Sequence, residues 1–136
     1  MNPIVRNILA VIAGVIVGGA ANMGIIMISG TLVPLPEGVD PNNLESIKEN
    51  LHLYQPIHFL MPWLAHAMGA FCGALVASLL AVSHKMAIAM GIAAWTMVGG
   101  IAACFMIPAP AWFMVSDLAL AYLPMGYLAG KIASRK

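Results

Sequence analysis

Three polar residues stand inside otherwise apolar stretches of this chain, and their side chains could carry chemistry: Asp117, His66 and Asn22. Asp117 is the only charged residue between Lys85 and Lys131. A charge in hydrocarbon costs at least about 2.5–3.5 kcal/mol on insertion scales, so Asp117 needs a partner or water. His66 is expected at a comparable depth in the outer half of a membrane, with Asn22 somewhat deeper. We therefore predict a buried Asp117–His66 pair with Asn22 nearby.

This pair has two interpretations, and the residues leave both open. An interhelical hydrogen bond between Asp117 and His66 could simply fix the packing of two helices. Alternatively, His66, Asp117 and Asn22 could form a ligand-binding site, open to the outside, that binds a cation, relays protons or holds a polar ligand. A metal ion is the one cofactor that this chemistry suggests.

A second group of possible metal ligands lies before and at the start of the same stretch as His66. Glu49 and His52 stand three residues apart, which is the spacing of one half of a carboxylate-bridged di-iron site, and His58 follows. A full site needs two such motifs, and the chain has one. We therefore weigh a metal site formed by His52, His58 and Glu49 against the simpler interpretation, the solvated face of a surface helix.

Sulfur side chains are abundant, with eleven methionines and two cysteines. Thioethers select Cu(I), so a copper path is conceivable, but methionine also fills irregular gaps in apolar packing. Cys72 and Cys104 form no CxxC motif and read as small core residues. The methionines expected in or near the outer half are Met23, Met27, Met61, Met68, Met106 and Met114.

Long apolar stretches must position these residues. Apolar residues make up 62% of the 136 residues and charged residues only 8%, whereas soluble domains carry about 25% charged residues. About 20 apolar residues cross a bilayer, and the gaps between charges predict four spans within a single domain, residues 1–136. We predict an all-α fold, an integral membrane four-helix transmembrane bundle. The predicted spans are residues 8–31, 57–82, 86–107 and 111–130.

The basic residues predict the orientation of this bundle. With four spans, the N-terminal side also receives the turn near Lys85 and the C-terminus, whereas Lys48 is the only basic residue on the opposite side. Cytoplasmic loops carry the excess of lysine and arginine, so both termini are predicted to be cytoplasmic. The N-terminal side thus holds five of the six basic residues: Arg6, Lys85, Lys131, Arg135 and Lys136.

The outer loop, residues 34–56, has a pattern of its own. Asp40 is predicted to cap a helix with Pro41 at its first position. Apolar residues then recur at helical spacing on one face, which predicts a short extracytoplasmic amphipathic helix at the membrane surface. That face holds Leu44, Ile47, Leu51 and Tyr54. An aromatic belt is expected at the same interface, formed by Tyr54, Phe59, Trp63, Trp112 and Phe113.

Glycines four residues apart occur in three spans and predict close helix packing. This spacing does not distinguish contacts within one chain from contacts between subunits. The pairs are Gly14 and Gly18, Gly69 and Gly73, and Gly126 and Gly130.

Two functions are compatible with these residues. The first is a non-enzymatic membrane module that forms a homo-oligomer or joins a membrane partner. The second is a protein for binding or permeation of a small ligand or cation at His66, Asp117 and Asn22. No nucleophile–base arrangement, phosphate-binding loop or HExxH motif indicates an enzyme. The net charge of +1 excludes a nucleic-acid partner and leaves the lipid bilayer as the expected one.

Three stretches resemble a group of small bacterial four-helix inner-membrane proteins to which no activity is assigned. They are LPEGVDPNN, HFLMPWLAHAMG and PAPAWFMVSDLALAYLPMGYLAG. The resemblance extends over nearly the whole chain. It implies the bacterial inner (cytoplasmic) membrane as the location, and it implies no activity.

Overall fold

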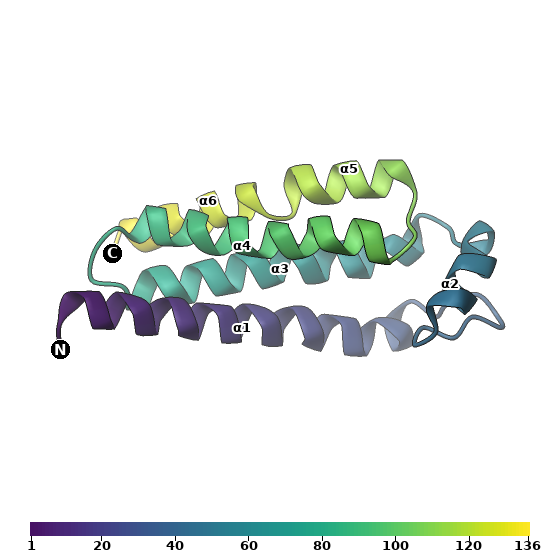
Figure 1. Ribbon diagram of the computed structural model, residues 1–136, viewed down its shortest axis with the longest axis horizontal. Helices are drawn as coiled ribbons and strands as arrows, with labels where there is room; N and C mark the ends of the chain where they lie inside the picture. Colours follow the sequence, from purple (N-terminus) through teal and green to yellow (C-terminus); the bar gives the residue numbers. More distant parts are fainter.

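The chain is described over all residues 1–136 by a computed structural model, and every regular element in it is helical. Four segments are long and apolar enough to cross a membrane, which indicates a multi-pass membrane protein and confirms the all-α prediction. They form an elongated bundle with both termini at one end and the short α2 at the other (Figure 1). In chain order the elements are α1 (Pro3–Leu32), α2 (Leu44–Asn50), the 3-10 turn η1 (Leu51–Leu53), α3 (Ile57–Leu80), α4 (Lys85–Met106), α5 (Ala111–Leu120) and α6 (Leu123–Ser134).

The first helix begins five residues before the predicted span. Asn2 accepts a hydrogen bond at its side-chain oxygen from the backbone N–H of Ile4 (2.8 Å), and Pro3 occupies the first helical position. Both are favoured at a helix N-terminus, because the oxygen satisfies a free N–H and proline there has none to satisfy. The cap therefore extends α1 through the polar residues Arg6 and Asn7, which do not belong to the apolar run.

Close contact between backbones joins α1 to α3. A Cβ atom placed on Gly14 would lie 2.6 Å from the carbonyl oxygen of Gly73, and one placed on Gly18 would lie 2.7 Å from that of Gly69. No side chain fits at such distances. The paired glycines of α1 and α3 thus serve a contact within the chain.

Polar contacts tie the N-terminal end of α1 to the turn between α3 and α4. The Arg6 side chain donates through Nε to the carbonyl oxygen of Leu80 (3.1 Å). The Asn7 side chain donates to Oγ of Ser83 (3.0 Å) and accepts from the backbone N–H of Val82 (3.0 Å). This end of the bundle is therefore held by hydrogen bonds as well as by packing.

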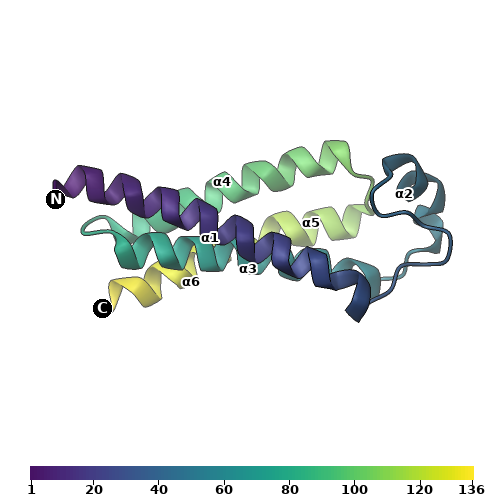
Figure 2. The same cartoon turned by 90° about the horizontal axis from the view of Figure 1, so that it is seen from below.

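The remaining core lies between α3, α4 and α6 and consists mostly of alanine. Ala74 and Ala77 of α3 pack with Ala89 and Ile92 of α4 and with Ala129 of α6. By contrast, α1 contacts α3 extensively and α4 hardly at all. Helices α1 and α4 diverge toward the end of the bundle that carries α2 (Figure 2).

The fourth predicted span is not the single helix that the sequence indicated. It is interrupted between α5 and α6, at Ala121 and Tyr122, and continues to Ser134 rather than ending at residue 130. Pro124 explains the interruption, because proline lacks an N–H and its ring clashes with the carbonyl group four residues earlier. In a continuous helix Asp117 and Gly126 would face opposite directions, nine residues apart. The interruption lets both be buried in the bundle.

The connection between α1 and α3 contains the predicted short helix, with a different start. Asn43, not Asp40, caps α2 by accepting at Oδ1 from the backbone N–H groups of Glu45 (3.0 Å) and Ser46 (3.3 Å). Asp40 instead accepts from the N–H of Asn42 (2.9 Å) and holds a turn before the helix. The prediction of the cap was therefore wrong, since an aspartate followed by proline favours a local turn as readily as a cap.

Candidate functional site

Asp117 is the centre of a buried network of polar side chains. It is 3% exposed, and each of its carboxylate oxygens has a partner. Oδ1 lies 2.8 Å from Nδ1 of His66, and Oδ2 accepts from the Tyr122 hydroxyl at 2.9 Å. The predicted pairing of Asp117 with His66 is confirmed, and Tyr122 is a third member.

Three elements bring these side chains together. Asp117 lies on α5, His66 in the middle of α3, and Tyr122 at the break before α6. The rings of His66 and Tyr122 are stacked, with centroids 5.8 Å apart and planes 26° apart. Gly100 of α4 leaves room for the Tyr122 ring, because a Cβ at this position would collide with the phenol. The network is therefore held by packing on several sides.

The hydrogen bonds define which atoms remain free. The contact with Asp117 engages Nδ1 of His66 and Oδ1 of the carboxyl group. A carboxylate on one ring nitrogen orients the imidazole and leaves Nε2 for another partner. The contact with His66 is the only ion-pair contact within 4.0 Å in the structure, so no lysine or arginine neutralises Asp117.

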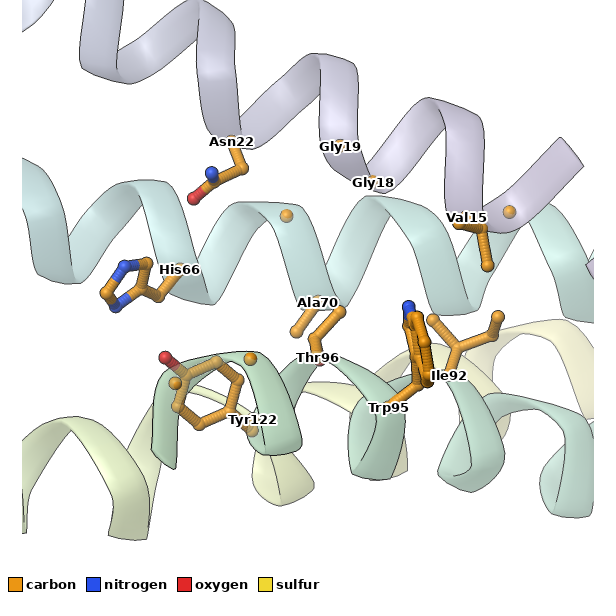
Figure 3. Close-up of a pocket in the computed structure, with 14 residues that line it drawn as sticks. Val15, Gly18, Gly19, Asn22, His66, Ala70, Ile92, Trp95, Thr96 and Tyr122 are labelled. Atoms are coloured by element: carbon orange, nitrogen blue, oxygen red, sulfur yellow. The ribbon is translucent and has the colours of Figure 1, made fainter. Parts of the chain in front are cut away.

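A cavity of about 370 Å³ lies on one side of His66, between α1 and α4 and against α3. Asn22, His66 and Tyr122 face this space together with Thr96 and Trp95 of α4 (Figure 3). The side-chain oxygen of Asn22 is buried and has no hydrogen-bond partner. An unpartnered buried acceptor costs about 1–3 kcal/mol, so this oxygen is available to accept a hydrogen bond from a donor group in the cavity.

A larger cavity, of about 620 Å³, lies on the other side of His66 toward the end that carries α2. It is bounded by α1, α3, the end of α4, α5 and the outer connection, and its walls include Ile47, Leu51 and Tyr54. Asp117 is the only charged residue in its walls, whereas His66 and Gly100 border both cavities. The polar network thus lies where the two cavities meet. Asn22, the third predicted ligand-binding residue, lines only the smaller cavity.

The second predicted group of metal ligands is not assembled. Glu49 and His52 are exposed, and Nδ1 of His58 accepts from the backbone N–H of Gln55 (2.8 Å) at the start of α3. No three His, Cys, Asp or Glu side chains lie close enough together to hold a metal ion. The structure therefore gives no support to a metal site formed by His52, His58 and Glu49, and that site stays a prediction.

Sulfur and aromatic side chains gather in the larger cavity. Its walls include four of the six outer methionines, Met23, Met27, Met61 and Met114, as well as Cys104. Cys72 lines neither cavity.

Four of the five aromatic residues predicted at the interface form a cluster beside the same cavity, whereas Trp63 packs elsewhere, against the buried group that contains Ala67 and Tyr122. The ring of Phe59 lies 5.7 Å from that of Tyr54, 5.5 Å from that of Trp112 and 5.0 Å from that of Phe113. Burial raises the pKa of the Tyr54 phenol, which therefore stays neutral.

Tyr122 is the functional candidate that the sequence reasoning missed. A tyrosine in an apolar stretch gives some signal, because a buried phenol usually finds a hydrogen-bond partner. Helical periodicity hides it, since five residues separate it from Asp117 and place the two on different faces of a continuous helix.

Comparisons of the chain with protein families, curated proteins and solved structures give no match.

Proposed function

We propose that this chain is a multi-pass protein of a bacterial inner membrane that binds a small ligand in the larger cavity, beside Asp117 and His66. The observation that carries the proposal is the buried Asp117, held by His66 and Tyr122 in the wall of a space of about 620 Å³. Intramembrane acids are costly and usually mark a ligand or ion path. Pockets for small molecules have volumes of about 300–1,000 Å³ and few, well-placed polar groups.

The space around the network supports ligand binding over a purely structural contact. A contact that only fixes packing needs no cavity, whereas His66 borders two of them and presents a ring nitrogen that Asp117 does not use. Asn22 adds an acceptor without a partner in the smaller cavity. These features leave hydrogen-bonding capacity that a ligand or water can use.

The glycine pairs no longer favour the alternative function, a module that assembles with itself. The glycine pairs at 14 and 18, 69 and 73, and 126 and 130 meet other parts of the same chain. They explain how the helices pack within one molecule and give no support for a second copy.

The charges support an orientation with the larger cavity toward the outside. Both termini and the turn near Lys85 lie at one end of the bundle (Figure 1). This end holds five of the six basic residues, so the positive-inside tendency favours a cytoplasmic position for it. The larger cavity, next to α2, then opens toward the extracytoplasmic side, and α2 is the short extracytoplasmic helix.

The two cysteines provide a direct test of this cavity and its orientation. In spheroplasts, we expect a membrane-impermeant methanethiosulfonate reagent to modify Cys104 in the Cys72→Ser variant, because Cys104 lines the cavity. Cys72 in the matched Cys104→Ser variant should stay unmodified, since it lines neither cavity. If Cys104 reacts only in inside-out vesicles, the orientation is wrong. If it reacts from neither side, no cavity accessible to water and ligands exists there.

A further inference from the structure

The larger cavity combines one buried carboxyl group, without a lysine or arginine beside it, with aromatic and sulfur-containing walls. Asp117 is the only charged residue among its 26 lining residues, and none of them is lysine or arginine. Asp117 is the only carboxyl group in these walls, and a carboxylate in an apolar region is costly without a countercharge. A ligand with a single positive charge would neutralise it.

The small number of oxygen ligands argues against a hard metal cation such as Ca²⁺ or Mg²⁺ in this cavity. Hard cations take about six to eight oxygen ligands, and the walls offer Asp117 as their only carboxylate. Both of its oxygens already accept hydrogen bonds, from His66 and from Tyr122. The site therefore suits a cation that binds through its charge and its surface rather than through directed bonds.

The walls provide that kind of surface. Tyr54, Phe59 and Phe113 line the cavity, and aromatic rings attract cations by the partial negative charge of their faces, most strongly when the cation is desolvated. The four methionines are flexible and polarisable and adapt to ligands of irregular shape. Together they describe a pocket for a bulky apolar group that carries a positive charge.

We propose that the ligand of this cavity is a lipophilic organic monocation, such as a quaternary ammonium compound with an aromatic group. This inference rests on the proposed function and names its ligand class. Asp117 supplies the attraction for the charge, with the ring cluster and the methionines surrounding the apolar part. Uncharged molecules of the same shape would gain only the contacts with the rings and the methionines, without the attraction to Asp117.

Two compounds of equal shape separate the charge from the shape. Benzyltrimethylammonium and neopentylbenzene differ only in a quaternary nitrogen replaced by a quaternary carbon. Equilibrium dialysis of the radiolabelled cation against the purified protein in detergent micelles measures its binding, with empty micelles as the blank. We expect saturable binding of the cation, and we expect neopentylbenzene to compete at least about tenfold more weakly, because only the cation gains from Asp117.

Variants of acidic residues locate the charge that matters. Asp117→Asn should weaken cation binding by at least about tenfold. Asp117→Glu keeps the charge and should bind more tightly than Asp117→Asn. Glu49→Gln removes an exposed acid outside the cavity and should stay within about twofold of the unmodified chain. If Asp117→Asn does not fold, the comparison of benzyltrimethylammonium with neopentylbenzene on the unmodified chain decides whether the cavity prefers a cation.

Three results would overturn the inference. They are equal competition by neopentylbenzene, unchanged affinity in a folded Asp117→Asn variant, and no saturable binding of the cation to the unmodified chain. The proposed function is judged separately by the external modification of Cys104. Protection of Cys104 by neopentylbenzene as well as by the cation would keep the binding cavity and reject its preference for charge.

Discussion

The contact between α1 and α3 leaves no space for a side chain at Gly18. A substitution at this position can therefore measure how much the close contact contributes to stability. A Cβ at Gly18 would lie 2.7 Å from the carbonyl oxygen of Gly69 and 3.2 Å from Cα of Gly73. Both neighbours are backbone atoms of a helix, so neither can rotate away. We therefore predict that Gly18→Ala forces α1 and α3 apart and destabilises the fold.

The adjacent residue supplies the control for this substitution. Gly19 lies on the same helix and would meet nothing within 4 Å of an added Cβ. Exchanging glycine for alanine favours a helix by up to about 1 kcal/mol at either position, so this gain cancels in the comparison. The remaining difference is the cost of overpacking, about 1–3 kcal/mol. Gly18→Ala should be less stable than Gly19→Ala by that amount.

Reversible unfolding in mixed detergent micelles with increasing SDS can measure this difference by tryptophan fluorescence. Trp63 of α3 and Trp95 of α4 report on the bundle around the contact. Equal stability of Gly18→Ala and Gly19→Ala would refute the reasoning, because it would mean that the backbones do not approach as closely as described. Greater loss in Gly19→Ala would point to an interface on another face of α1, the one that carries Gly19.

Three other substitutions probe the polar network and its surroundings, each measured by the same unfolding assay. Tyr122→Phe removes the donor to the buried Oδ2 of Asp117 and should cost about 1–3 kcal/mol; no change would mean that the hydroxyl does not bond to Asp117. Gly100→Ala should cost about 1–3 kcal/mol because the new methyl group meets the phenol of Tyr122, and the loss should be smaller when Tyr122→Phe is already present. Asn22→Leu removes a buried acceptor without a partner and should leave stability unchanged or raise it by about 1 kcal/mol; a clear loss would show that the amide has a partner.

The spans could be predicted from the sequence because two strong signals agree there. Apolar stretches of about 20 residues have few alternatives to a membrane helix, and the charges mark their limits. The pairing of His66 with Asp117 was also predictable, since each polar group in an apolar span needs a partner and few were available. Asn22 was correctly placed on the α1 face that packs against α3, because it continues the spacing of Gly14 and Gly18.

The interruption of the fourth span was not predictable from the same signals. Pro124 indicates a disturbed helix, but the direction in which the chain turns depends on what the neighbouring helices accept. Here Asp117 of the preceding α5 provides a partner for Tyr122, and Gly100 provides the space for its ring. Gly100 belongs to α4, which the local sequence does not contain. The role of Tyr122 could therefore not be read from helical periodicity.

The positions of the cavities follow from the same packing that holds the bundle together. Gly14 and Gly18 bring α1 so close to α3 that its contact with α4 is slight, and the two helices diverge toward α2 (Figure 2). In water such a gap between apolar helices would tend to close, because burial of apolar surface is favourable. In a bilayer that force between helices is absent, so a gap beside a tight contact can persist. Asp117 is anchored at this gap by two side chains, and the buried acid thereby borders an open space instead of a filled core.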